Sequence, residues 1–124
     1  MAARILLADD FDIVRSGIRA LLDGPPGWEI CGEAANGREA VEKTLELKPD
    51  LVVLDVSMPI MNGIEAARQI RTFAPATKIV IFSVHRSAQL LEQAKAAGVD
   101  ACLAKGAAAE ELRNTVAALL ASEM

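Results

Sequence analysis

The sequence predicts an α/β protein with a doubly wound sheet of five parallel strands. Short runs of branched apolar residues, typical of strands buried on both faces, recur through its 124 residues. Segments with apolar residues three or four positions apart, typical of helices, separate these runs. Strands that alternate with helices form a parallel sheet covered on both sides. The length is that of one domain, so we expect residues 1–124 to form a single unit.

Five segments are expected to be strands. In the clearest, Leu51–Asp55, four branched apolar residues lead into one carboxylate, and Pro49 and Pro59 lie on either side. The other four expected strands are Arg4–Ala8, Trp28–Ala34, Lys78–Ser83 and the short Ala101–Ala104.

A helix is expected after each strand, with one apolar face turned toward the sheet. Asp10 or Asp12 can cap the start of the first helix. Pro49 and Pro75 end the second and third, and Gly98 follows the fourth. The expected inner faces are Val14, Ile18, Leu21 and Leu22; Val41 and Leu45; Ile64, Ala67, Ile70 and Phe73; Leu90, Leu91 and Ala94; and Leu112, Val116, Leu119 and Leu120.

Five such units commonly adopt the flavodoxin-like strand order 2-1-3-4-5, in which ligands bind where the first and third strands end. The first strand ends at Asp9 and Asp10, and the third ends at Asp55. The fourth strand ends at Ser83 and the fifth leads to Lys105. The sequence therefore places three carboxylates, a hydroxyl and a lysine at one edge of the sheet.

The chemistry of this group of side chains points to phosphoryl transfer. Three converging carboxylates repel one another, and a divalent cation removes the repulsion. Hard oxygen donors favour Mg²⁺ and also accept Mn²⁺. An aspartate can act as a nucleophile and become an aspartyl phosphate, while a lysine neutralises the phosphoryl oxygens. Each residue alone also fits an ordinary role as a helix cap, a strand-end hydroxyl or a solvated charge; their joint placement favours the site.

Composition excludes several other classes. The net charge of −4, with scattered Lys and Arg, argues against nucleic-acid binding by this segment itself. No apolar run approaches the roughly 18 residues that cross a membrane, and the acids near the N-terminus do not fit an export signal. Cys31 and Cys102 lack metal-site spacing, so we expect reduced thiols and a cytoplasmic location. His85 is expected to be a solvated loop residue.

By the residues that follow its predicted strands, the chain resembles, over nearly its whole length, the receiver domain of two-component response regulators. The resemblance implies that Asp55 accepts a phosphoryl group from a phosphohistidine on a sensor histidine kinase. It also implies a signalling domain that assists its own phosphorylation and dephosphorylation and is otherwise not an enzyme. The residues that carry it are the pair Asp9-Asp10, Asp55 followed by Met58-Pro59 and Gly63, Ser83, and Lys105.

The same resemblance implies roles for the remaining site residues. Mg²⁺ would be bound by Asp10, Asp55 and the backbone carbonyl of Ser57, with Asp9 acting through a water molecule. Ser83 and Lys105 would contact the phosphoryl oxygens.

Ser83 and Cys102 occupy the family's switch positions. Relatives commonly have an aromatic residue where this chain has Cys102. We therefore do not expect switching by rotation of a ring.

Finer motifs are similar to the NarL/FixJ subfamily, whose members carry a LuxR-type helix-turn-helix output domain. These motifs are Leu-Ala-Asp-Asp, Val-Arg-Ser-Gly, Gly-Glu-Ala-Ala-Asn-Gly-Arg-Glu-Ala and Met-Asn-Gly-Ile-Glu-Ala. They imply transcriptional control through an output domain that this chain lacks, DNA contact only through that domain, and a possible homodimer on phosphorylation. We expect an excised receiver, with a stand-alone receiver as the alternative.

Three other readings remain open at this stage. One is a small doubly wound enzyme or flavin carrier, although the acids after the first strand oppose a phosphate cradle. Another is a phosphohydrolase, because Asp10-Phe11-Asp12 has the spacing Asp-x-Asp. The third is a receiver-like interaction module that works without phosphorylation.

Overall fold

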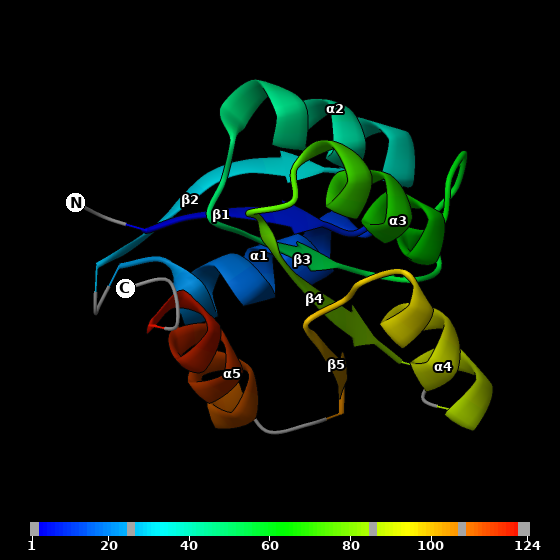
Figure 1. The fold of residues 1–124 in the computed structure, drawn as a ribbon. Coiled ribbons are helices and arrows are strands. Elements are labelled where there is room, and N and C mark those ends of the chain that lie inside the picture. Colours follow the sequence, from blue (N-terminus) through cyan, green and yellow to red (C-terminus); the bar gives the residue numbers. More distant parts are fainter. Residues whose placement is uncertain (1–2, 25–26, 85–86, 107–108, 122–124) are drawn as a thin grey trace.

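The computed structural model describes residues 3–24, 27–84, 87–106 and 109–121. Strands and helices alternate through this part of the chain (Figure 1). The strands are β1 (Ala3–Ala8), β2 (Trp28–Ala34), β3 (Leu51–Leu54), β4 (Lys78–Ser83) and β5 (Ala101–Ala104). The helices are α1 (Asp12–Leu22), α2 (Gly37–Leu47), α3 (Gly63–Phe73), α4 (Ala88–Ala96) and α5 (Ala109–Ala121). Every expected strand is confirmed to within one residue.

All neighbouring strands pair in parallel, and the sheet has the order β2-β1-β3-β4-β5. The predicted fold class and strand order are therefore confirmed. Helices α1 and α5 cover one face of the sheet, and α2, α3 and α4 cover the other (Figure 1). Within the described residues, no helix combines the length and the apolar character that crossing a membrane requires.

The central strand β3 is buried on both faces, as its composition predicts. Leu51 and Val53 pack in the apolar layer beneath α1 and α5. Val52 and Leu54 pack in the opposite layer, against α2, α3 and α4. This alternation follows from the two-residue period of a strand. It leaves Asp55 at the point where the strand emerges from both layers.

The inner faces of three helices differ from the prediction at single positions. Leu45, Phe73 and Leu91 are exposed, so placing them toward the sheet was wrong. Each lies at the margin of its apolar stripe, and a helix on a sheet buries only an arc of its surface. The spacing of apolar residues in the sequence shows which side of a helix faces the sheet, but only the packing shows where the buried arc ends.

The start of α1 also differs from the prediction, because neither Asp10 nor Asp12 caps it. The cap position is occupied by Phe11, whose side chain makes no capping hydrogen bond. The Phe11 N–H instead donates to Asp9 Oδ1 over 2.9 Å. Gly98 follows α4 with a φ of +86°, as expected for a residue that ends a helix. His85 lies outside the described residues.

Candidate functional site

The expected site residues meet at the carboxyl edge of the sheet. The ladder continues one residue past the strands, since Asp55 N donates to the Ala8 carbonyl (2.9 Å) and Lys105 N donates to the Ser83 carbonyl (2.7 Å). Asp9 N donates in the same way to the Ala34 carbonyl of β2, over 3.0 Å. Backbone hydrogen bonds therefore fix the main chain at Asp9, Asp55 and Lys105, from which their side chains extend.

Three carboxylates form a compact cluster at this edge. Asp9, Asp10 and Asp55 each offer an oxygen, and these oxygens lie within 4.8 Å of one another. Asp9 is 1% exposed and Asp55 is 5% exposed, so water screens their repulsion poorly. Asp10 Oδ1 is buried and has no hydrogen-bond partner. An unsatisfied carboxylate oxygen in a cluster of hard donors fits a divalent cation, so this acidic pocket can hold a metal ion.

Lys105 compensates part of the negative charge. Its Nζ lies 2.6 Å from Asp9 Oδ2 and 3.4 Å from Asp55 Oδ1. Asp9 is thus held at both carboxylate oxygens, by Lys105 on one side and by the Phe11 N–H on the other. Asp10 and Asp9 are therefore not equivalent: Asp10 has a carboxylate oxygen without a hydrogen-bond partner, whereas both carboxylate oxygens of Asp9 already accept hydrogen bonds.

The titration of Asp55 is shifted by its surroundings. Burial raises the pKa of its carboxyl group above the ordinary value, and the nearby charge of Asp9 raises it further. Lys105 and the backbone N–H of Val56 act in the opposite direction and only partly offset this rise. The negative charge of Asp55 is therefore unfavourable in the folded protein, and a neighbouring cation stabilises it.

The remaining predicted residues do not belong to the carboxylate cluster. Ser83 is fully buried at the end of β4, and Ser57 is exposed in the loop after β3. Cys102 is half-buried within β5, paired in register with Ile81, and it packs against the layer under α2, α3 and α4. Asp12 is exposed in the first turn of α1 and is not part of the carboxylate cluster. The Asp-x-Asp spacing therefore does not bring two carboxylates together.

Two glycines hold the loop that follows Asp55. A Cβ at Gly63 would lie 2.0 Å from the Asp55 carbonyl oxygen, and Gly63 N donates to the Val56 carbonyl over 2.8 Å. A Cβ at Gly37 would lie 2.0 Å from the Met61 carbonyl oxygen, to which Gly37 N donates over 2.9 Å. Only glycine allows these approaches. The loop is therefore closed on itself and fastened to the start of α2.

Two features at this edge of the sheet were not predicted from the sequence. Phe11, Ile13, Ile60 and Val84 are each at least 60% exposed and come from the segments that follow β1, β3 and β4. We call these four residues the apolar rim. The second feature is Arg15, which donates a hydrogen bond to the Asp9 carbonyl. Its only signal in the sequence is the motif Val-Arg-Ser-Gly, which by itself indicates no contact.

Residues 5–117 match the family model of the response regulator receiver domain. Among curated proteins, the chemotaxis protein CheY of Thermotoga maritima is 43% identical over 101 residues, which are 81% of this chain and 83% of that protein. The transcriptional regulatory protein LnrK of Bacillus subtilis is 34% identical over 113 residues, 91% of this chain and 51% of that protein. This chain thus spans about half the length of LnrK.

Solved structures give the same result. A two-component response regulator of the LuxR family from Aurantimonas sp. SI85-9A1 has a TM-score of 0.93 and 38% sequence identity. The similarity covers 98% of this chain and 87% of that chain.

Proposed function

This chain belongs to the response regulator receiver family, and we propose that its switch is the phosphorylation of Asp55 by the phosphohistidine of a sensor histidine kinase. The observation that carries the proposal is the position of Asp55. It ends the central strand, lies beside two further carboxylates, and has the Lys105 ammonium 3.4 Å away. A carboxylate in this setting is oriented as a nucleophile and has a cation ready for the group it accepts.

In the proposed step, a carboxylate oxygen of Asp55 attacks the phosphorus atom and forms an acyl phosphate. The bond between phosphorus and the donor imidazole nitrogen breaks, and the imidazole leaves with the bonding electron pair and takes up a proton. Lys105 and Ser83 contact the phosphoryl oxygens and stabilise their charge. In this proposal the domain assists its own phosphorylation and dephosphorylation and otherwise acts in signalling, not as an enzyme.

The donors of the acidic pocket fit Mg²⁺, with Mn²⁺ as a substitute. We assign Asp10, Asp55 and the backbone carbonyl of Ser57 as direct ligands. The unpartnered Oδ1 of Asp10 supports this assignment. Asp9, whose two oxygens are engaged by Lys105 and Phe11, acts through a water molecule. Bound there, the cation neutralises negative charge on the phosphoryl oxygens.

The partners follow from the surface and from the relatives. The residues of the apolar rim are exposed and lie in segments that follow β1, β3 and β4, so a kinase docked at this edge of the sheet would cover them. Because LnrK is named a transcriptional regulator and a LuxR-family regulator shares this fold, we propose that phosphorylation here controls transcription. DNA contact belongs to a separate output region of the full protein, aided by a homodimer of receivers. Thiols rather than disulfides at Cys31 and Cys102 agree with a cytoplasmic setting.

The test is phosphorylation by acetyl phosphate in the presence of Mg²⁺, followed by intact mass and by mapping of the modified residue. The parent protein should gain one phosphoryl group on Asp55, and Asp55→Asn should gain none. Asp9→Asn should react more slowly, and the matched control Asp12→Asn should behave like the parent, since Asp12 is exposed and outside the cluster. A stable adduct on Asp55→Asn would move the nucleophile elsewhere, and an unmodified parent would favour an interaction module.

A further inference from the structure

Arg15 reaches from the first turns of α1 back to the end of β1. One terminal nitrogen of its guanidinium donates to the backbone carbonyl of Asp9. Its Nε donates to Glu33 Oε1 on β2 over 2.9 Å. The side chain is largely buried, at 16% exposure. A single planar group therefore connects the edge strand to the backbone of the acid pair.

The carbonyl that Arg15 contacts belongs to the peptide group joining Asp9 to Asp10. A peptide group is planar, so the direction of its oxygen fixes the plane that leads into Asp10. The other side of Asp9 is held by the hydrogen bond from its N–H to the Ala34 carbonyl. Asp10 has one carboxylate oxygen without any partner, so side-chain hydrogen bonds do not hold that oxygen in place. The backbone orientation set by Arg15 therefore contributes to where that oxygen lies.

Glu33 in turn holds the guanidinium of Arg15. Arg19 donates to Glu33 Oε2 from Nε over 2.8 Å and from a terminal nitrogen over 2.6 Å. Burial acts to raise the pKa of Glu33, but the hydrogen bonds from Arg19 and Arg15 outweigh it and lower that pKa. The carboxylate therefore stays charged.

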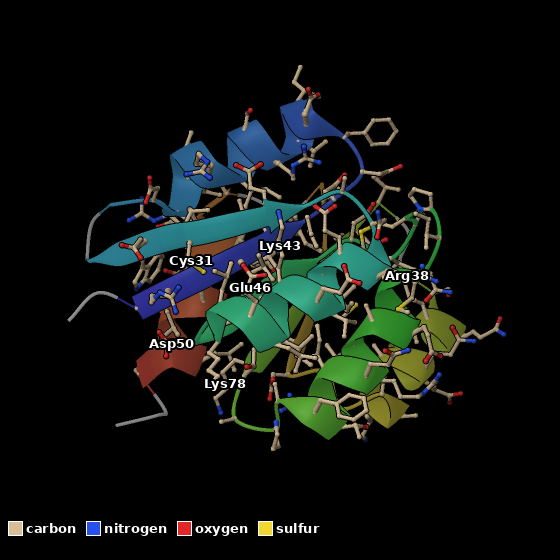
Figure 2. The ribbon with its side chains drawn as sticks, turned by 90° about the horizontal axis from the view of Figure 1, so that it is seen from above. Cys31, Arg38, Lys43, Glu46, Asp50 and Lys78 are labelled. Carbon is tan, nitrogen blue, oxygen red and sulfur yellow. The ribbon has the colours of Figure 1, made fainter. Side chains whose placement is uncertain are left out.

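The backbone of Glu33 is fixed as well, because Lys43 of α2 donates to its carbonyl. Figure 2 shows Lys43 on the side of α2 that faces β2. Both the side chain and the main chain of Glu33 are thus tied to neighbouring helices. Glu33 is therefore held in place and can fix the position of the Arg15 guanidinium.

We propose that Arg15 is a positioning residue for the metal site, which acts by fixing the peptide group between Asp9 and Asp10. The inference rests on the proposed Mg²⁺ site. The fork of the guanidinium is what permits the role, since it binds the Glu33 carboxylate and the Asp9 carbonyl with different nitrogens in one plane. A lysine ammonium carries the same charge but does not have this rigid geometry.

The chain offers a matched control for the test. Arg15→Gln and Arg19→Gln each remove one positive charge and one partner of Glu33, but only Arg15 touches the Asp9 carbonyl. Mg²⁺ binding is measured by calorimetry on both variants, on Arg15→Lys and on the parent, after circular dichroism has shown that each is folded. Arg15→Gln should bind Mg²⁺ about tenfold more weakly, the usual loss when a group that orients a metal ligand is removed. Arg19→Gln should match the parent, and Arg15→Lys should lie between.

A second readout separates positioning from general destabilisation. The Mg²⁺ concentration that gives half-maximal phosphorylation by acetyl phosphate should rise in Arg15→Gln by the same factor as the dissociation constant. Equal Mg²⁺ affinities in Arg15→Gln and Arg19→Gln would overturn the inference, because charge or stability alone would then account for the result. If the parent binds Mg²⁺ and Arg15→Gln binds it equally well, only this inference fails. If the parent does not bind Mg²⁺, the proposed metal site fails and this inference with it.

Discussion

The ammonium group of Lys105 lies 2.6 Å from Asp9 Oδ2, although 96 positions separate the two residues in the sequence. The contact joins the end of β5 to the end of β1 across the mouth of β3 and β4, which lie between them in the sheet. It brings a cation into the acidic pocket, where the same nitrogen is 3.4 Å from Asp55. Lys105 therefore offsets the negative charge of Asp9 and Asp55 in addition to its proposed role in phosphoryl transfer.

Removing this cation should destabilise the protein when Mg²⁺ is absent. Lys105→Met leaves Asp9 and Asp55 buried beside each other without compensation, and we expect a loss of about 3 kcal/mol in the free energy of unfolding, the low end for a buried pair that loses one partner. Mg²⁺ should restore part of the loss. Urea unfolding with EDTA and with Mg²⁺ measures both. Lys95→Met, on an exposed position of α4, is the control, and an equal loss in the two variants would contradict the prediction.

Asp10→Asn should separate metal binding from stability. The substitution removes a charged ligand, so Mg²⁺ affinity should fall tenfold or more, which is about 1.4 kcal/mol or more of binding free energy. It also neutralises a buried oxygen that has no partner, so the metal-free protein should become more stable by about 1 kcal/mol. Calorimetry and metal-free urea unfolding give the two values. The control Asp12→Asn, at an exposed position, should change neither the Mg²⁺ affinity nor the metal-free stability. If metal-free Asp10→Asn were less stable than the parent, the unpartnered oxygen of Asp10 would not destabilise the fold.

The raised pKa of Asp55 should appear in the pH dependence of stability. Burial and the neighbouring Asp9 favour the protonated form in the folded state, relative to the ordinary value of 3.8. A group of this kind adds stability below its unfolded pKa and loses it as the pH rises through the folded pKa. In metal-free buffer, the stability of the parent relative to Asp55→Asn should therefore fall as the pH is raised from about 4 toward 7. Urea unfolding of both proteins across this pH range measures the difference in stability. Mg²⁺ should reduce its decrease with pH. If the stabilities of the two proteins change with pH in parallel, the pKa of Asp55 is not raised.

The sequence was sufficient to predict the strands, their order and the meeting of Asp9, Asp10 and Asp55. These follow from the chain itself: β3 is an unbroken apolar run, and parallel strands present their carboxyl ends at one edge. The acids come directly after the strands, so predicting the sheet also placed their backbones.

The parts that could not be predicted depend on contacts between distant segments. No local pattern indicates that Lys105 pairs with Asp9 or that Arg15 reaches the Asp9 carbonyl. The predicted burial of Leu45 and Phe73 was wrong for a related reason. Both residues have helical spacing, but the neighbouring element decides which edge of the apolar stripe is covered. The expected cap on α1 failed because Asp9, one residue earlier, already accepts the Phe11 N–H.

Gly63 should be essential for the shape of the phosphoacceptor loop. In Gly63→Ala the new Cβ would meet the Asp55 carbonyl oxygen at 2.0 Å, and this backbone atom cannot move without displacing Asp55. We expect slower phosphorylation by acetyl phosphate and a loss of about 1–3 kcal/mol in unfolding free energy. Gly17→Ala, within α1 and with nothing within 4 Å of the new Cβ, should instead stabilise the protein by about 1 kcal/mol. Unchanged phosphorylation in Gly63→Ala would mean that the loop tolerates displacement.

The conformational response to phosphorylation should be concentrated between Ser83 and Leu91. A phosphoryl group adds about −1.5 to −2 charges at the pocket, and Ser83 and Lys105, whose backbones are joined by a 2.7 Å hydrogen bond, are the donors placed to follow it. Charge-assisted hydrogen bonds of about 1.5–3 kcal/mol each supply part of the roughly 5.5 kcal/mol that shifts a population from 1:99 to 99:1.

Val84 is exposed, and α4 begins at Ser87, whose Oγ accepts a 3.1 Å hydrogen bond from Leu90 N, so these described residues are suited to carry the shift. Cys102, on the adjacent strand, is small and cannot sweep the volume of a ring, so β5 should change less. Amide hydrogen exchange with and without a beryllium fluoride mimic of the acyl phosphate measures both segments, with Asp55→Asn as the control that should not respond. Equal protection of residues 83–91 in the two states, with the mimic demonstrably bound to the parent, would show that the signal leaves the pocket by another route.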